Sequence, residues 1–103
     1  QFSQRVARLQ EDDSRLAARQ EADAALYNLR TAERAIEIAQ EAELVAGEDL
    51  RVVRERYSVG VATILDVLIS QNAADQASVD VVTSRYDYVL ARAELESILG
   101  RVL

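Results

Sequence analysis

The chain has 103 residues, a net charge of −6, and no cysteine, histidine, tryptophan or proline. Without cysteine and histidine it has no thiol chemistry and lacks the commonest metal and acid–base ligands. The acidic balance argues against a nucleic-acid binder and against binding to an anionic membrane surface, because both need basic side chains. The length predicts one domain or less, and the absence of proline permits very long helices.

The first half of the chain has the pattern of a long helix. From Ala22 to Tyr57 apolar residues recur three and four positions apart, with Glu43 as the interruption, which is the period of about 3.5 residues of a left-handed coiled coil. A second apolar row lies beside the first, so the apolar face is wider than a simple dimer seam needs. We therefore expect a helix over about residues 3–57 that has two helical neighbours. The second row consists of Ala35, Ile38, Ala42, Val45 and Val52.

A tight turn is predicted at residues 58–63. Gly60 can adopt a positive φ without a Cβ clash, so it suits the sharpest point of the turn. Thr63 lies three residues before Asp66, at the spacing of a capping box. In that arrangement the Thr63 hydroxyl accepts the backbone N–H of Asp66, and the Asp66 carboxylate accepts the N–H of Thr63. Thr63 is thus the expected cap of a second helix.

The second helix is predicted over about residues 64–99. Its seam alternates between a larger apolar row, which includes Tyr88, and a row of small residues that lets the helix axes approach closely. Leu99-Gly100 is typical of a helix end with a glycine at C′. The larger row is Val67, Ala74, Val81, Tyr88, Leu95 and Val102, and the small row is Ser70, Ala77, Ser84 and Ala91, followed by Ile98.

These elements predict an all-α fold, a single long antiparallel helical hairpin over residues 1–103 with unequal arms. Folding back at the turn places Leu103 opposite about residue 19, so residues 1–18 have no partner within the chain. No linker divides the chain, and the longest uncharged run, Tyr57–Leu65, is too short to span a bilayer. Because the chain starts at Gln1 without a methionine or a signal-peptide pattern, we expect it to be a piece of a longer protein.

Polar and aromatic side chains provide few candidates for chemistry. No nucleophile–base pair, phosphate-binding loop, metal cluster or cofactor site is predicted, so we do not expect an enzyme. Four acids share one heptad position on the second helix; a solvated face is the favoured interpretation, and a water-filled lumen selective for cations is the alternative. The tyrosines are interpreted as packing residues. The acids are Asp66, Asp80, Asp87 and Glu94, and the tyrosines are Tyr57, Tyr86 and Tyr88.

Residues Tyr57–Gln71 resemble the Y-x-x-G-x-x-[ST]-x-x-D-[VL]-L-x-[AS]-Q pattern of the TolC-like outer-membrane efflux proteins. The similarity continues through Ala77, Arg85-Tyr-Asp-Tyr88, Ala91 and Leu95–Gly100, where the family has an R-Y-x-Y segment and a terminal L-x-x-x-x-G. It covers the whole chain and corresponds to the C-terminal helical hairpin of that family. The family's long helix followed by a shorter one agrees with the unequal arms.

The resemblance implies a part of a trimeric outer-membrane channel, located in the periplasm, that serves drug efflux or type I secretion. It implies that the tip residues Val59, Gly60 and Val61 dock a periplasmic adaptor protein, although the turn alone favours a simple helix connection. It also implies that Asp66 projects into the pore as part of an acidic constriction. An Asp66 turned into the pore conflicts with its expected capping role.

The chain departs from the family pattern at the gate. Some members carry a second acid where this chain has Ile69, and some carry a basic residue where it has Val61 or Ala62. We therefore expect the gate to be held differently or less tightly. We also expect the isolated hairpin to self-associate through the flank that meets neighbouring hairpins. The alternative function is a structural coiled-coil scaffold or adaptor hairpin with no channel role.

Overall fold

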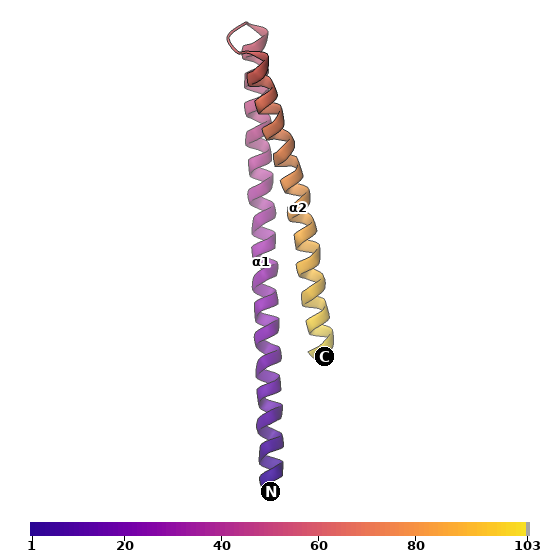
Figure 1. Ribbon diagram of the computed structural model, residues 1–103. Helices are drawn as coiled ribbons and strands as arrows, with labels where there is room; N and C mark the ends of the chain where they lie inside the picture. The colour runs from indigo at the N-terminus through magenta and orange to yellow at the C-terminus, as the bar shows by residue number, and fades with distance from the viewer. Residues whose placement is uncertain (103) are drawn as a thin grey trace.

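The computed structural model describes residues 1–102 and contains two helices that fold back on each other as an extended antiparallel hairpin (Figure 1). Helix α1 (Phe2–Ser58) has 57 residues and helix α2 (Ile64–Val102) has 39. The hairpin measures 88 × 16 × 16 Å. The all-α hairpin fold and its unequal arms are therefore confirmed, and α1 continues past the end of α2 (Figure 1).

The core of the hairpin is one narrow seam between α1 and α2. The buried side chains fall on the predicted heptad rows, and the partly buried ones, including Glu43, fill the positions between them. Half of the buried residues are alanines, which leave room for the helix axes to approach. Apolar side chains at this period lie on one side of each helix, and burying them brings the two helices into contact. The buried residues are Ala25, Ala39, Leu50, Ala77, Val81 and Ile98.

Both helices carry further apolar side chains outside this seam. Ile38 and Val45, from the second row predicted on α1, are 55% and 57% exposed. On α2 a second row, which we call the outer row, is formed by Val79, Val82, Tyr86 and Val89, again three and four residues apart and all more than half exposed. A helix that is apolar on opposite sides needs cover on both. The outer row therefore predicts a further helical neighbour on the side of α2 that faces away from α1.

The helix boundaries differ from the expected ones at two places. Ser58 belongs to α1, so the chain between the helices is shorter than predicted. Helix α2 runs through Gly100 instead of ending there, and among the described residues only Gly60 has a positive φ. The prediction of a helix end at Leu99-Gly100 was wrong because a glycine costs a helix only about 1 kcal/mol relative to alanine and does not force termination.

The tyrosines also need correction. Tyr88 lies half-buried on the seam as expected, but Tyr57 and Tyr86 are 47% and 63% exposed, so neither packs in the core of the hairpin.

Residues 1–17 are exposed along α1, which agrees with an arm that has no partner in the chain. The expected position of Leu103 opposite residue 19 lies outside the described residues. Neither α1 nor α2 contains a stretch apolar and long enough to cross a lipid bilayer.

Candidate functional site

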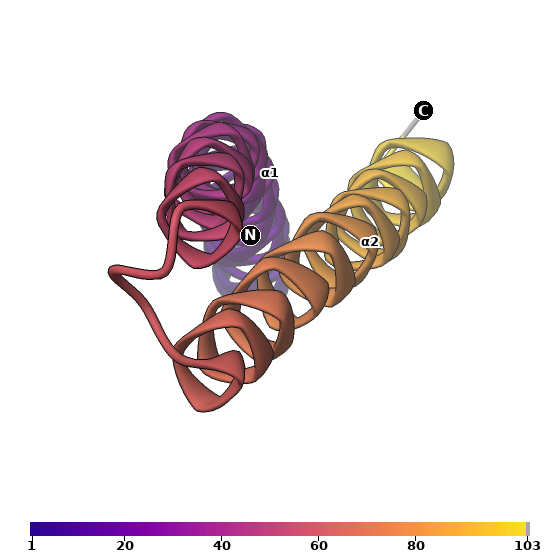
Figure 2. The same cartoon turned by 90° about the horizontal axis from the view of Figure 1, so that it is seen from above.

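The tip of the hairpin is the five-residue connection 59–63, which joins the end of α1 to the start of α2 (Figure 2). Its first half ends α1 with a Schellman motif. The N–H of Gly60 donates to the carbonyl oxygen of Tyr57 at 3.1 Å, and the N–H of Val61 donates to that of Arg56 at 2.9 Å. Gly60 has φ +84°, the left-handed conformation that this motif requires at C′. The glycine thus stops α1 by satisfying carbonyls of its last turn.

The second half of the tip starts α2 with the two hydrogen bonds expected of a capping box. The backbone N–H of Thr63 donates to Asp66 Oδ2 at 3.0 Å, and the backbone N–H of Asp66 donates to Thr63 Oγ1 at 3.2 Å. The acid in the first turn also complements the positive end of the helix dipole. Two local motifs, placed back to back, therefore fix the reversal of the chain without help from any other segment.

Two valines project from this turn on either side of Gly60. Val59 is 73% exposed and Val61 is 71% exposed. Single exposed apolar residues are common on protein surfaces. Here, however, both lie at the far end of a shaft that is 88 Å long. The structure therefore leaves the residues expected to dock a partner exposed at one end of the hairpin.

A hollow of about 370 Å³ lies beside the tip. Its apolar lining includes Val61 and Ala62 from the turn and Ile69 from α2. Its charged lining consists of Arg56 from the last turn of α1 and Asp66 from the first turn of α2. Sequence reasoning missed Arg56, although its position one turn before Gly60 could have drawn attention to it. Arg56 places a positive charge near the expected gate residue, where Val61 and Ala62 supply none.

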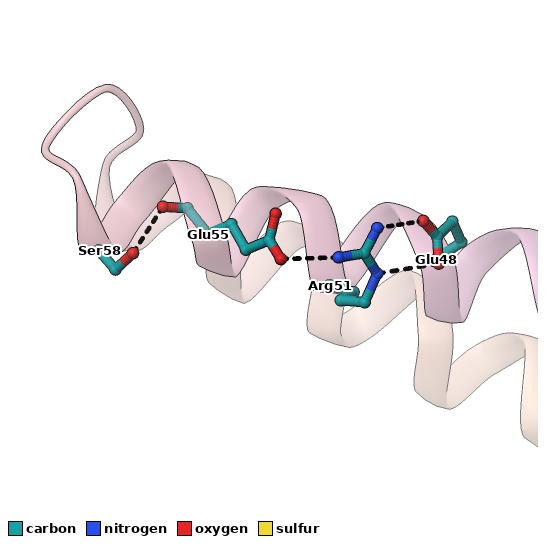
Figure 3. Close-up of polar contacts among 4 residues, drawn as sticks. All are labelled: Glu48, Arg51, Glu55 and Ser58. Carbon is teal, nitrogen blue, oxygen red and sulfur yellow. Dashed lines mark hydrogen bonds and ion pairs between the residues drawn. The ribbon is translucent and has the colours of Figure 1, made fainter.

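The shaft just below the tip carries a ladder of charges on its exposed surface (Figure 3). Arg51 donates to Glu55 at 2.7 Å and to Glu48 at 3.0 Å, and Ser58 Oγ donates to the carbonyl oxygen of Glu55 at 2.7 Å. The hydrogen bond and the charge of Arg51 lower the pKa of Glu48, and the hydrogen bond and charge of Glu48 raise the pKa of Arg51. Because these groups are exposed, the ladder stabilises the helix only slightly.

The acidic line on α2 does not converge on one point. Asp80, Asp87 and Glu94 are exposed and lie at the same heptad position as Asp66. Along the helix, Asp66 is about 21 Å from Asp80, and the later acids are about 10 Å apart. Asp80 Oδ1 accepts a hydrogen bond of 3.0 Å from the Gln76 side chain. Within residues 1–102 no group of acids is arranged to hold a metal ion. The acids form a charged stripe along α2.

The structure consists of two long helices, a narrow seam between them, and further apolar rows that face outward. The family model of the outer membrane efflux protein matches residues 1–101. The chain belongs to this family, as the resemblance at Tyr57–Gln71 predicted. A comparison with curated proteins and a comparison with solved structures each give no match.

Family membership makes the chain a component of an outer-membrane efflux channel. The alternative of a coiled-coil scaffold with no channel role is therefore set aside.

The outer row of α2 is a feature that sequence reasoning missed. The signal was present, because Leu65 and Leu68 begin the same three–four spacing, which Asn72 and Asp75 interrupt before Val79 resumes it.

Proposed function

We propose that this hairpin is a segment of the periplasmic helical duct of a trimeric outer-membrane channel that works in tripartite efflux or type I secretion. Its tip at Val59, Gly60 and Val61 docks a periplasmic adaptor protein, and Asp66 contributes to the gate. The role is passive: the hairpin supplies wall, docking surface and gate, and it requires no cofactor. The observation that carries the proposal is the pair of exposed valines at the end of the 88 Å shaft.

The tip suits docking because its shape is set before a partner arrives. The Schellman motif and the capping box hold the turn with backbone hydrogen bonds. A binding surface that is already ordered loses little conformational entropy on association. Val59 and Val61 then offer apolar area, and the hollow beside Val61 can receive a side chain of the partner.

Asp66 can serve both the cap and the gate. The capping hydrogen bond uses Oδ2, and a carboxylate has a second oxygen with its own acceptor sites. Asp66 also lines the open hollow, so its charge borders solvent while the cap is intact. The sequence predicted a conflict between capping and facing a pore. With two carboxylate oxygens, Asp66 can do both.

The duct wall accounts for the apolar side chains that the hairpin leaves exposed. The outer row of α2 has the spacing of a coiled-coil seam, so a neighbouring helix would pack along it as α1 packs along the other side. The chain on its own should associate through this row. Light scattering that shows a stable monomer at high concentration would argue against this use of the outer row.

The experiment that tests docking uses the absence of native cysteine in this chain. A single cysteine replaces Val59 in the intact parent protein, and cross-links to periplasmic proteins are collected in cells. The matched control is Leu44→Cys, because Leu44 is 75% exposed and Val59 is 73% exposed, but Leu44 lies on the shaft. A cross-link to an adaptor from position 59 and none from position 44 is expected.

Two other results would count against the proposal. Adaptor cross-links of equal yield from both positions would mean that the shaft and not the tip is the contact surface. No adaptor cross-link at position 59, with the protein folded and present in the outer membrane, would reduce Val59 and Val61 to parts of a simple turn.

A further inference from the structure

One hydrogen bond between side chains joins α1 to α2 close to the tip. Arg54 Nη2 donates to the side-chain oxygen Oε1 of Gln71 at 2.6 Å. Among the described residues, each of the other hydrogen bonds between two side chains joins residues three or four positions apart in the same helix. We call the pair of Arg54 and Gln71 the clasp, because it links one helix to the other.

A second glutamine of α2 shows what is particular to Gln71. Gln71 and Gln76 each donate through Nε2 to an aspartate four residues later at 3.0 Å. Gln76 is exposed and bonded within α2, whereas Gln71 is partly buried and also accepts from α1. An arginine can only donate and an ionised carboxylate can only accept. Arg54 and Asp75 together therefore fix the orientation of the Gln71 amide, with its oxygen toward α1.

The clasp lies where the seam buries the least apolar surface. The buried side chains nearest the tip are Leu50 on α1 and Ala77 on α2, and none of residues 51–76, all described by the structure, is buried. Burial of apolar side chains is the main force that holds packed helices together, so it contributes least in this stretch. A hydrogen bond with a charged donor therefore matters more for helix contact here than it would along the shaft.

The clasp and the hollow beside the tip lie on opposite sides of the seam. Arg54 and Gln71 each follow a seam residue by four positions, whereas Arg56 and Asp66 each directly precede one. In a heptad these are positions e and g, which border the seam on its two sides. Because Arg56 and Asp66 line the hollow from different helices, the helix spacing that the clasp maintains also sets the width of the hollow.

We propose that the clasp holds the tip end of α2 in a fixed position against α1 and so fixes the width of the hollow. With the clasp closed, Asp66 stays at one distance from Arg56. With the clasp open, the helices can move apart at the tip end while the seam along the shaft stays packed. The clasp concerns the hairpin alone, so this proposal does not rest on the docking of an adaptor.

The test measures distances between spin labels on introduced cysteines in the full-length parent protein. One pair of labels, at the exposed residues Ser58 and Asn72, spans the two helices at the tip end. A control pair, at the exposed residues Leu44 and Thr83, spans them on the shaft. Labelled protein is mixed with an excess of unlabelled protein, so that distances within one chain dominate.

Gln71→Met opens the clasp, because methionine has about the length of glutamine but no amide. Losing one hydrogen bond should raise the population of separated helices at the tip end about three- to tenfold. The distance distribution of the tip-end pair should broaden accordingly. The distribution of the shaft pair should stay the same.

Three further variants identify the bond to α1 as the cause. Gln76→Met removes the matched hydrogen bond within α2 and should leave both distributions unchanged. Gln71→Glu can still accept from Arg54 and should keep the narrow distribution at the tip end. Arg54→Met combined with Gln71→Met should give a distribution no broader than Gln71→Met alone, because the single change already opens the clasp.

Four results would overturn the proposal. An unchanged tip-end distribution in Gln71→Met would mean that the clasp holds nothing. Equal broadening in Gln76→Met would assign the effect to α2 itself and not to its contact with α1. Equal broadening in Gln71→Glu would mean that packing of the glutamine, and not its hydrogen bond, keeps the helices together. Broadening of the shaft pair in Gln71→Met would mean that the whole hairpin had loosened.

Discussion

The heptad register makes a sharp prediction for two leucines of α1. Leu50 lies on the seam and is 8% exposed, whereas Leu44, less than two turns away, is 75% exposed. Leu50→Ala and Leu44→Ala are the same chemical change in the same helix, with the same change in helix propensity. Any difference between the two variants therefore reports the burial of the leucine side chain against α2.

The magnitude follows from the apolar groups that leave the seam. Burying a methylene group contributes about 0.8 kcal/mol, and leucine exceeds alanine by three carbons, so Leu50→Ala should lose about 2 kcal/mol. In large cores the same change costs about 2–5 kcal/mol because a cavity remains. The seam here is narrow and open at its edges, so water can fill the space and the lower value applies. Leu44→Ala should change the stability by less than about 0.5 kcal/mol.

Urea unfolding followed by circular dichroism measures both variants of the 103-residue chain. Sedimentation at the same concentration must show that the two variants and the unmodified chain have the same oligomeric state. Equal losses of stability for Leu44→Ala and Leu50→Ala would refute the register. A larger loss for Leu44→Ala would mean that another surface, and not the seam with α2, supplies the stability.

Other predictions concern the glycines and the charge ladder. Gly60→Ala should cost about 1–2 kcal/mol from its φ of +84° alone, because the added Cβ meets no atom within 4 Å. Gly47→Ala, equally open but helical, should stabilise the chain by about 1 kcal/mol, and a loss of stability in the same urea assay would contradict this. Because Arg51 lowers the pKa of Glu48, the contribution of this pair is present above the ordinary value of 4.5 and is lost as the pH falls through the lowered pKa. Thermal midpoints of Glu48→Gln should therefore depend less on pH below 4.5 than those of the unmodified chain, and identical pH profiles would count against the ladder.

The seam and the tip could be predicted because their signals are local. A heptad repeat such as the one through Leu50 indicates which side of a helix is buried. The spacing of Gly60, Thr63 and Asp66 indicates where one helix ends and the next begins. The extension of α2 through Gly100 could not be predicted in this way. Glycine weakens a helix without ending it, so the boundary depends on what the flanking residues gain by staying helical.

The exposed positions were harder to predict for a different reason. Apolar rows indicate that a helix has neighbours, but not whether those neighbours lie in the same chain. Tyr86 illustrates the ambiguity: it was interpreted as a packing residue, and in the hairpin it is exposed on the outer row. Prediction of the site was limited for the same reason at Arg56, whose importance depends on the hollow formed when α1 and α2 come together.

The hydrogen bonds of the tip constrain how the proposed gate can move. Both ends of the turn are held by hydrogen bonds between residues close in sequence, so refolding the turn would break the Schellman motif, the capping box or both. The seam, by contrast, is a narrow contact between two helices, which can shift by small sliding movements of packed helices. We therefore expect an adaptor bound at Val59 and Val61 to displace the hairpin as a unit. Asp66 would then move with α2 while its hydrogen bond to Thr63 stays intact.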